Sequence, residues 1–226
     1  MKNLLIALVS VCLFWSCGGG SKTASEAREG KGGVFIGGIL KLNEEEYLKS
    51  LYPPNITEVT GQRIDNNIYE GLVRFNVKTL AIEPCIAKSW DISDGGKKFV
   101  FHLRSGIKFT DDPCFPDGKG RTLTAKDIKY CFDRISYSKP TEIQAGWLFK
   151  DLVVGANEYT EKTAKDPKDN SGVSGIVVLD DSTLEISLTK PFSVFIDRLA
   201  LPQTAIYAKE AYEKYGSDMR THCVGT

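Results

Sequence analysis

The stretch PCIAKSWDISDGGKKFVFHLRSGIKFTDDPCFPDGKGRTLTAKDIKYCFDRI, residues Pro84–Ile135, decides the fold because a hairpin pattern in it is followed by a helix pattern. From Phe99 to Leu103, large apolar residues occupy every second position, which is the period of a strand with one buried face. Asp94-Gly95-Gly96 precedes this run and supplies residues that tolerate positive φ. We therefore expect Trp90–Ser93 and Lys97–Arg104 to pair as a β-hairpin.

A helix is predicted directly after this region. Thr124-Ala125-Lys126-Asp127 resembles a capping box, with Asp127 in the place that Glu or Gln usually holds. Apolar residues follow at the spacing of one helix face: Ile128, Cys131, Phe132 and Ile135. The pattern predicts an amphipathic helix that buries this face.

The order of these features is specific enough to indicate a family. In chain order they are Ala87, Trp90, the glycine turn, the strand Phe99–Arg104, Gly106-Ile107-Lys108-Phe109, Gly120-Arg121 and Thr124-Ala125-x-Asp127. They resemble the best-marked segment of the extracytoplasmic solute-binding proteins of family 5, the peptide-binding lipoproteins that serve ABC importers. Asn67-Ile68-Tyr69-Glu70-Gly71-Leu72 is similar to the phrase at which that family's first lobe leads into an inserted subdomain.

The resemblance implies an α/β (α+β) fold of the type II periplasmic binding protein class, in which an inserted β-rich subdomain interrupts the first lobe. The implied division is a lipoprotein signal peptide at 1–16, a flexible tether at 17–32, a partial first lobe at 33–69 and 201–226, and the inserted subdomain at 70–200. Val224-Gly225-Thr226 stops where the family continues with Gly-Pro-aromatic. We therefore expect an incomplete fold, the N-terminal fragment of a longer protein that has a second large lobe.

Local patterns predict further elements. Strand patterns lie at Gly32–Gly38, Gly175–Leu179 and Thr183–Leu188, with Asp180-Asp181-Ser182 as the turn between the last two. Helix patterns lie at Gln62–Glu70, around Ala145–Glu158 and from Lys190-Pro191-Phe192 onward. Tyr52 to Thr60 and the polar stretch Lys162–Gly172 are predicted to be loops.

The N-terminus resembles a lipoprotein signal. An apolar run from Leu4 to Trp15 follows Lys2 and is too short to cross a bilayer as a mature helix. Ser16 precedes Cys17, and Gly18-Gly19-Gly20-Ser21 supplies a flexible spacer. The resemblance implies that Cys17 is acylated, for example with palmitate, and anchors the protein to a membrane of the cell envelope on its periplasmic side. Ordinary signal-peptidase cleavage, with Cys17 as a spare thiol, is the alternative.

The composition is that of a globular domain with a core, since 42% of the residues are hydrophobic and 26% are charged. Lysine plus arginine and aspartate plus glutamate both total 29, which argues against nucleic acid as a partner. The sequence has no CxxC pair and only two histidines, so we expect no metal site and no cofactor.

The cysteines allow a disulfide without specifying it. Once Cys12 and Cys17 are assigned to the signal and the lipid, four remain, and four cysteines allow three connectivities. Cys131 lies on the predicted buried helix face, so we expect an inert small hydrophobe there. Cys114 and Cys223 fall in predicted loops and are the candidate pair if a disulfide forms.

The function is also implied by the resemblance. Proteins of that family close two lobes around an extended oligopeptide, or another small solute, and deliver it to a membrane permease driven by an ATPase. The segment that matches the family's first-lobe contact with the peptide backbone is Thr57-Glu58-Val59-Thr60, and its main-chain groups are the candidate ligand contacts. Glu58 is a candidate partner for a ligand amine, and a plain surface loop is the alternative. We expect the protein to act as a monomer.

Two other functions compete with this one. An enzyme is disfavoured because adjacent His222 and Cys223 point apart, His102 lies on a predicted strand, and the aspartate pairs at 111–112 and 180–181 have the pattern of turns. No catalytic residues are therefore expected. The other rival is a lipid-anchored solute-sensing or adhesive binding module without a transport role, which an absence of neighbouring permease and ATPase genes would favour.

Overall fold

The computed structural model describes residues 28–33, 35–37, 41, 43–44 and 46–226. The chain divides into two units, Met1–Glu45 and Glu46–Thr226, which are described separately below. The predicted signal peptide and its Cys17 lie outside the described residues.

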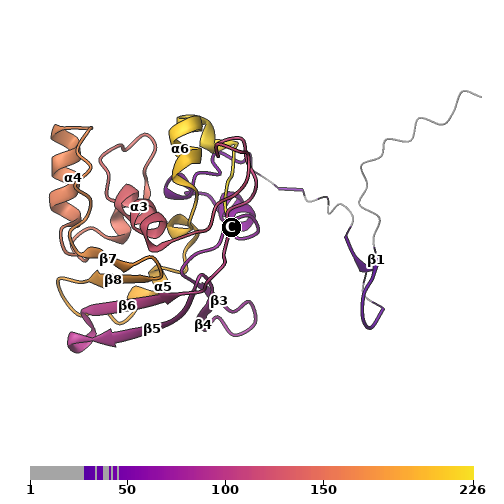
Figure 1. The fold of residues 1–226 in the computed structure, drawn as a ribbon, viewed down its shortest axis with the longest axis horizontal. Helices are drawn as coiled ribbons and strands as arrows, with labels where there is room; N and C mark the ends of the chain where they lie inside the picture. Colours follow the sequence, from indigo (N-terminus) through magenta and orange to yellow (C-terminus); the bar gives the residue numbers. More distant parts are fainter. Residues whose placement is uncertain (1–27, 34, 38–40, 42, 45) are drawn as a thin grey trace, which may run out of the picture. The chain divides into compact units, whose positions relative to one another are not determined.

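The described part of the first unit is a small hairpin (Figure 1). β1 (Arg28–Glu29) pairs antiparallel with β2 (Phe35–Ile36). Gly32 and Gly33 lie in the turn between them with φ angles of 81° and 75°. The strand observed within the range 32–38 is Phe35–Ile36, shorter than predicted, and its partner is Arg28–Glu29.

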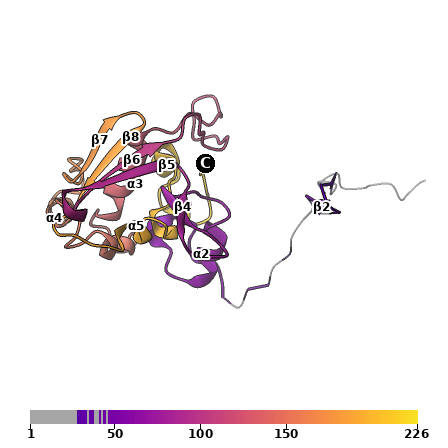
Figure 2. The ribbon, with the colours of Figure 1, turned by 90° about the horizontal axis from the view of Figure 1, so that it is seen from below.

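The main sheet of the second unit confirms both predicted hairpins. Its antiparallel strands lie side by side in the order β5 (Ala87–Ser93), β6 (Lys98–Leu103), β8 (Thr183–Ser187) and β7 (Ile176–Asp180) (Figure 2). The turn η3 (Asp94–Gly96) joins β5 to β6, and its residues have φ angles of 48°, 61° and 88°. These positive angles explain why two glycines occupy the turn.

One face of this sheet forms the core. Alternate residues of β6 and β8 are buried there: Phe99, Phe101, Leu103, Leu184 and Ile186. α3 (Ala125–Ile135) packs on the sheet, and Figure 1 shows α3 and α4 on the same side of it. The buried helix face consists of the predicted residues, Ile128, Cys131, Phe132 and Ile135. The capping box is also present, with the Thr124 amide donating to Asp127 Oδ2 at 2.8 Å.

The helix predicted around Ala145–Glu158 is wrong, because two elements stand there. They are the short 3₁₀ turn η4 (Ala145–Leu148) and the helix α4 (Ala156–Lys165). Gly155 separates them with a φ of 79°, and a Cβ at this position would lie 2.1 Å from Ser174 Oγ. The chain therefore breaks where close packing on Ser174 admits only glycine.

Three other boundaries differ from the prediction. α2 (Val59–Asp65) begins inside the predicted loop and ends before Glu70. α4 continues to Lys165, so the predicted loop from Lys162 begins as helix. α5 (Phe195–Arg198) starts after the expected Lys190-Pro191-Phe192. Short helices depend on tertiary packing more than on their own periodicity, which accounts for these shifts.

The beginning and the end of the second unit lie side by side (Figure 1). The elements involved are η2 (Pro53–Asn55), β3 (Val73–Phe75), β4 (Ile82–Pro84), η5 (Pro202–Thr204), α6 (Lys209–Tyr215) and η6 (Gly216–Arg220). The Leu51 amide donates to Arg220 O at 2.8 Å, and the Ile206 amide donates to Glu70 O at 2.9 Å. Backbone hydrogen bonds thus join segments that are far apart in the sequence.

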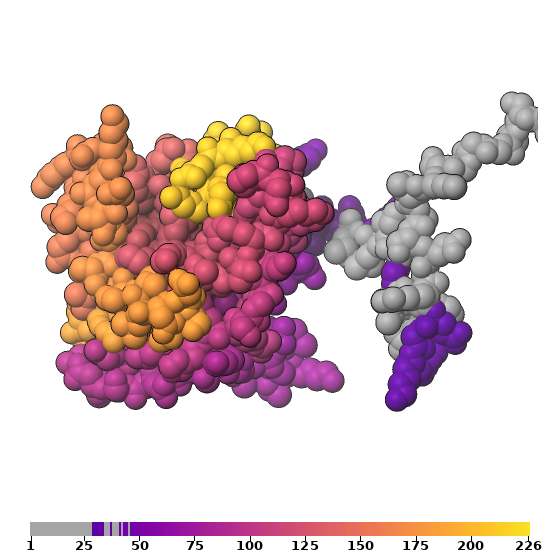
Figure 3. Space-filling model, viewed as in Figure 1, coloured from indigo at the N-terminus to yellow at the C-terminus, as the bar shows by residue number. Residues whose placement is uncertain are grey.

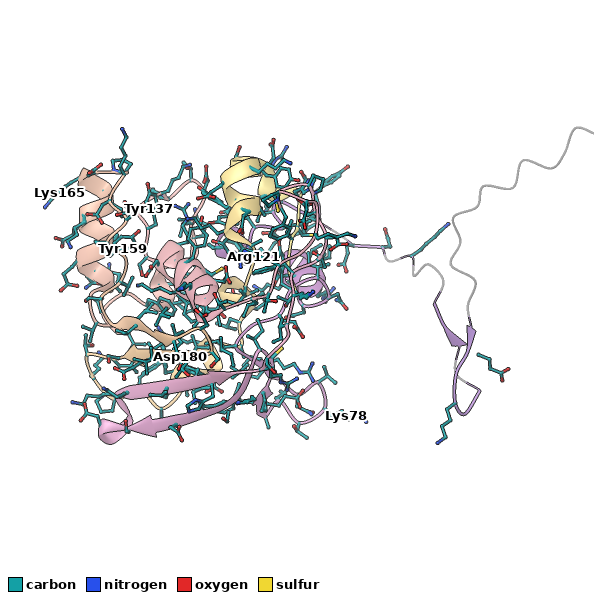
Figure 4. The ribbon with its side chains drawn as sticks, viewed as in Figure 1. Lys78, Arg121, Tyr137, Tyr159, Lys165 and Asp180 are labelled. Atoms are coloured by element: carbon teal, nitrogen blue, oxygen red, sulfur yellow. The ribbon has the colours of Figure 1, made fainter. Side chains whose placement is uncertain are left out.

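A partly buried ion-pair network ties the start of α3 to α6. Arg121 donates from Nη2 to Asp127 Oδ1 at 2.6 Å and from Nε to Glu210 Oε1 at 2.7 Å. Figure 4 places Arg121 between these two helices. The hydrogen bonds that Arg121 donates to Asp127, and then to Glu210, raise the pKa of Arg121 well above its ordinary value despite its partial burial. The guanidinium therefore stays charged and serves as a fixed link.

The described cysteines, Cys85, Cys114, Cys131 and Cys223, are free thiols. Cys131 is buried, as predicted, but the candidate disulfide between Cys114 and Cys223 is not formed. Burial, followed by a hydrogen bond to Asp112, raises the pKa of the Cys114 thiol to about 12. Because disulfide formation needs a thiolate, this environment disfavours the pairing at neutral pH.

Candidate functional site

The predicted ligand segment Thr57–Thr60 lies at the start of α2. Thr57 and Glu58 precede the helix, and Val59 and Thr60 are in its first turn, so the segment is not one continuous loop. Val59 is 61% exposed and Thr57 is also exposed, whereas Glu58 and Thr60 are buried. The segment thus presents two of its four side chains to solvent.

Glu58 holds its own chain together. Its Oε1 accepts a hydrogen bond from the Lys49 amide at 3.0 Å, and its Oε2 accepts from the Thr57 amide at 3.2 Å and the Thr57 hydroxyl at 3.1 Å. Burial acts to raise the pKa of Glu58, but these hydrogen bonds outweigh it and the pKa lies below its ordinary value. Both carboxylate oxygens are therefore engaged, and Glu58 ties the Lys49 segment to the start of α2.

This tie fixes an exposed apolar pair that the sequence prediction missed. Tyr47 is 95% exposed and Leu48 is also exposed, immediately before Lys49. On the other side, the Leu51 amide is bonded to Arg220 O, so the segment is held at two points. The signal was present in the sequence as two apolar residues inside the charged stretch Asn43–Lys49.

Two cavities adjoin the other end of α2. The first has a volume of about 300 Å³ and is lined by residues that include Asp65, Tyr69, Glu70, Cys85 and Thr226. The second has a volume of about 700 Å³ and is lined by residues that include Gln62, Phe75, Val77, Leu80 and Glu83. Asn66, Arg74 and Ala200–Pro202 line both cavities. The predicted segment Thr57–Thr60 lines neither of them.

The first cavity contains two buried polar groups without partners. Asp65 is 1% exposed, and its Oδ1 has no hydrogen-bond partner. Tyr69, four residues further along and beyond the end of α2, is also buried, and its hydroxyl has no hydrogen-bond partner. Burial raises the pKa of Asp65 to about 8 and raises the pKa of Tyr69 well above its ordinary value. At neutral pH the Asp65 carboxyl is therefore largely protonated, and it is poised to meet a hydrogen-bonding group.

Several other polar side chains of this cavity wall are paired with one another. Glu70 Oε2 accepts from the Thr226 hydroxyl at 3.0 Å, and Glu70 Oε1 accepts from Cys85 Sγ at 3.6 Å. Arg74 Nε donates to Glu83 Oε1 at 2.6 Å on the exposed hairpin of β3 and β4. Asp65 Oδ1 and the Tyr69 hydroxyl are the buried side-chain atoms of the described cavity wall that have no hydrogen-bond partner.

The residues considered for catalysis are not brought together. His102 Nε2 lies 2.9 Å from Asp91 Oδ2 on the sheet, and His222 Nε2 lies 3.5 Å from Asp112 Oδ2. In the space-filling view the C-terminal residues lie against the loop before α3 (Figure 3). The Tyr215 hydroxyl donates to Asp112 Oδ1 of this loop at 2.7 Å. Among the described residues, no cluster of three or more His, Cys, Asp and Glu side chains is arranged to bind a metal ion. In the same part of the chain, no helix is both long enough and apolar enough to span a bilayer.

Comparison with known proteins identifies the family. Residues 81–226 match the sequence profile described as "Bacterial extracellular solute-binding proteins, family 5 Middle". The chain belongs to this family, whose members are substrate-binding proteins. The order of motifs from Ala87 to Asp127 therefore indicated the family correctly.

Curated relatives are about 30% identical to this chain over the residues that match. The periplasmic oligopeptide-binding protein of Escherichia coli is 32% identical over 176 residues, which are 77% of this chain and 29% of that protein. The glutathione-binding protein of Salmonella typhimurium is 29% identical over 177 residues, which are 78% of this chain and 28% of that protein. The chain thus spans less than a third of the length of these relatives.

Solved structures show the same fold. A periplasmic oligopeptide-binding protein from Borrelia burgdorferi matches with a TM-score of 0.63 and 31% identity, over 74% of this chain and 31% of that one. A periplasmic binding protein from Helicobacter pylori, in complex with the peptide STSA, matches with a TM-score of 0.61 and 26% identity, over 78% of this chain and 33% of that one. The fold is therefore the predicted α/β fold of type II periplasmic binding proteins, of which this chain covers about a third.

Proposed function

We propose that this chain belongs to the substrate-binding component of an ABC importer, which captures an oligopeptide or a related small solute between two lobes and delivers it to the permease and its ATPase. The match of residues 81–226 to the solute-binding family carries this proposal. It is supported by relatives named as oligopeptide-, dipeptide- and glutathione-binding proteins. Binding without chemical change to the solute is the activity that such a component requires.

Within the chain, we propose that the ligand faces the start of α2. Thr57 and Val59 are exposed there, and the neighbouring Tyr47 and Leu48 present apolar side chains. Glu58 stabilises this surface by bonding the Lys49 amide and Thr57. Main-chain groups of an exposed, fixed segment can pair with an extended peptide irrespective of its sequence, while the exposed apolar side chains contact the peptide's own side chains.

The anchoring is proposed on the sequence alone. Acylation of Cys17 would hold a monomeric protein at the periplasmic side of a membrane of the cell envelope, with residues 17–32 as the tether. Growth with labelled palmitate tests this directly. Label should enter the wild-type chain and be absent from Cys17→Ser, and equal labelling of the two would contradict the anchor.

The binding function is tested by peptide capture. The complete two-lobed protein is incubated with a defined pool of di- to pentapeptides, washed, and analysed by mass spectrometry for retained peptides. Retention of a subset, lost on thermal unfolding of the chain, is expected. Retention of no peptide by the folded two-lobed protein would contradict a peptide ligand. Neighbouring genes for permeases and an ATPase would separate import from a sensing or adhesive role.

A further inference from the structure

The first cavity, beside the end of α2, has an unpaired acid in its wall. Asp65 is the last residue of α2 and lines this cavity of about 300 Å³. The residue is 1% exposed, and its Oδ1 has no hydrogen-bond partner among the described residues. Burial alone raises the pKa of Asp65 to about 8, without a contribution from a hydrogen bond or a neighbouring charge. Because buried polar groups in folded proteins are nearly always paired, this carboxyl requires a partner that the described residues do not supply.

The charges in the wall of this cavity cancel. Glu70 and Arg74 both line it and have opposite formal charges. Glu70 already accepts two hydrogen bonds, and Arg74 donates to Glu83 at 2.6 Å. Because Asp65 is largely protonated at pH 7, the wall has no net formal charge. An ion that entered the cavity would lose its hydration without meeting an unpaired counter-charge, so the cavity favours an uncharged guest.

The protonated carboxyl of Asp65 defines the chemistry of this guest. It offers one O–H donor beside one C=O acceptor. A primary amide has the complementary pair, because one of its N–H groups lies on the same side as its C=O. An acid and a primary amide therefore form two hydrogen bonds at once, whereas a carboxylate has no donor and an ammonium group has no acceptor. The volume is at the lower end of the range of about 300–1,000 Å³ that small-molecule pockets have, which suits a small group.

We propose that the first cavity is a binding site for an uncharged primary amide, which the Asp65 carboxyl holds. The inference goes beyond the proposed function, because it requires neither lobe closure nor a transporter. The same chemistry has two sources, a free small amide and the side chain of glutamine or asparagine in a peptide. The helix α2 is about 10 Å long, so a short extended peptide at its start can reach a cavity beside its other end.

Propionamide, propionate and propylammonium are the probes, because they are similar in size and differ in charge and in hydrogen-bonding groups. Each is titrated into the purified, ¹⁵N-labelled full chain at pH 7 and constant ionic strength, and the backbone N–H signals of residues 66–71 are followed by NMR. Asp65→Asn keeps a neutral donor and acceptor, and Asp65→Leu has a similar size without either. Asp181→Asn is the matched control, because Asp181 is an exposed turn residue in a surface pair with Lys126.

Propionamide should shift these signals saturably, and propionate and propylammonium should bind about tenfold more weakly or worse. Asp65→Leu should reduce affinity for propionamide by about tenfold, and Asp65→Asn and Asp181→Asn by less than about threefold. Raising the pH from 7 to 9 ionises Asp65, so propionamide should bind the wild-type chain about tenfold more weakly at pH 9, and Asp65→Asn should not change. The other titratable neighbours are Tyr69, Cys85 and Cys223, and burial raises the pKa of each. Asp65 is therefore the group that titrates in this interval.

Three results would overturn the site: no shift with propionamide, propionate binding as tight as that of propionamide, or unchanged binding by folded Asp65→Leu. None of them bears on peptide capture, so the proposed function stands or falls separately. The source of the amide is decided on the complete two-lobed protein with Ala-Gln-Ala, Ala-Glu-Ala and Ala-Met-Ala, which share one main chain. A preference for the glutamine peptide that Asp65→Leu removes assigns the site to a peptide side chain. Equal affinities for the three peptides assign it to a free small amide.

Discussion

Replacing Asp65 with asparagine should stabilise the chain at neutral pH. Asp65 is buried, its Oδ1 is unpartnered, and burial raises its pKa from 3.8 to about 8. A carboxyl whose pKa is raised on folding contributes its stability at acid pH and loses it as the pH rises towards the folded pKa. Asparagine has the same shape as the protonated acid and does not titrate in this range.

The magnitude follows from the size of this pKa difference. Between pH 4 and pH 7 the unfolded chain releases a proton that folded Asp65 retains. The free energy of unfolding therefore falls by about 1.4 kcal/mol per pH unit, or by about 4 kcal/mol by pH 7. Relaxation around the buried group and water entry reduce such penalties, so Asp65→Asn should gain about 2 kcal/mol at pH 7. For a unit of this size that gain raises Tm by roughly 4–8 °C.

Urea unfolding followed by circular dichroism at pH 4.5, 7 and 8.5 measures the effect. The wild-type chain should lose stability across this range, and Asp65→Asn should lose less of it. The two should differ little at pH 4.5. Asp181→Asn is the control, since Asp181 is an exposed turn residue in a surface pair with Lys126 at 3.3 Å. An Asp65→Asn chain with the wild-type pH slope, and no gain at pH 7, would refute the reasoning.

Three further substitutions test the fold and the candidate site. Glu58→Gln should lower the free energy of unfolding by about 1 kcal/mol at pH 7, because it weakens the hydrogen bonds to Lys49 and Thr57. Folding lowers the pKa of Glu58, so the advantage of the wild-type chain should disappear as the pH falls. Urea titrations at pH 7 and pH 3.5 measure this difference. Gly155→Ala should lower the free energy of unfolding by about 2 kcal/mol or more, because φ is 79° and the new Cβ would meet the Ser174 side chain. A melting temperature equal to that of the wild-type chain would contradict the turn geometry. Phe132→Ala should cost about 3–5 kcal/mol, since the ring is fully buried, and calorimetry should detect the loss.

Local patterns predicted the parts of the fold whose contacts are themselves local. The hairpin around Asp94–Gly96 and the helix Ala125–Ile135 follow from alternation, turn residues and a capping box within a few positions of one another. The break at Gly155 was missed because its cause, Ser174, lies outside the local pattern. Periodicity cannot report a close approach between segments that are distant in the sequence.

The candidate site was predicted less completely than the fold. The family resemblance pointed to Thr57–Thr60, but it did not show that Glu58 is engaged by the Lys49 amide or that Tyr47 is exposed. The unpartnered state of Asp65 depends on which atoms surround it after folding. Burial and hydrogen-bond satisfaction belong to the packed chain, so residue identities alone do not determine them.

The hydrogen bond from the Ile206 amide to Glu70 O has a consequence for protein engineering. It brings the two ends of the intervening polypeptide, residues 71–205, next to each other. A segment with adjacent ends can be exchanged as a cassette, because a recipient needs to match only one junction rather than two separate attachment points. Chimaeras between relatives that keep Glu70 and Ile206 as splice points should therefore preserve the backbone geometry of both donors.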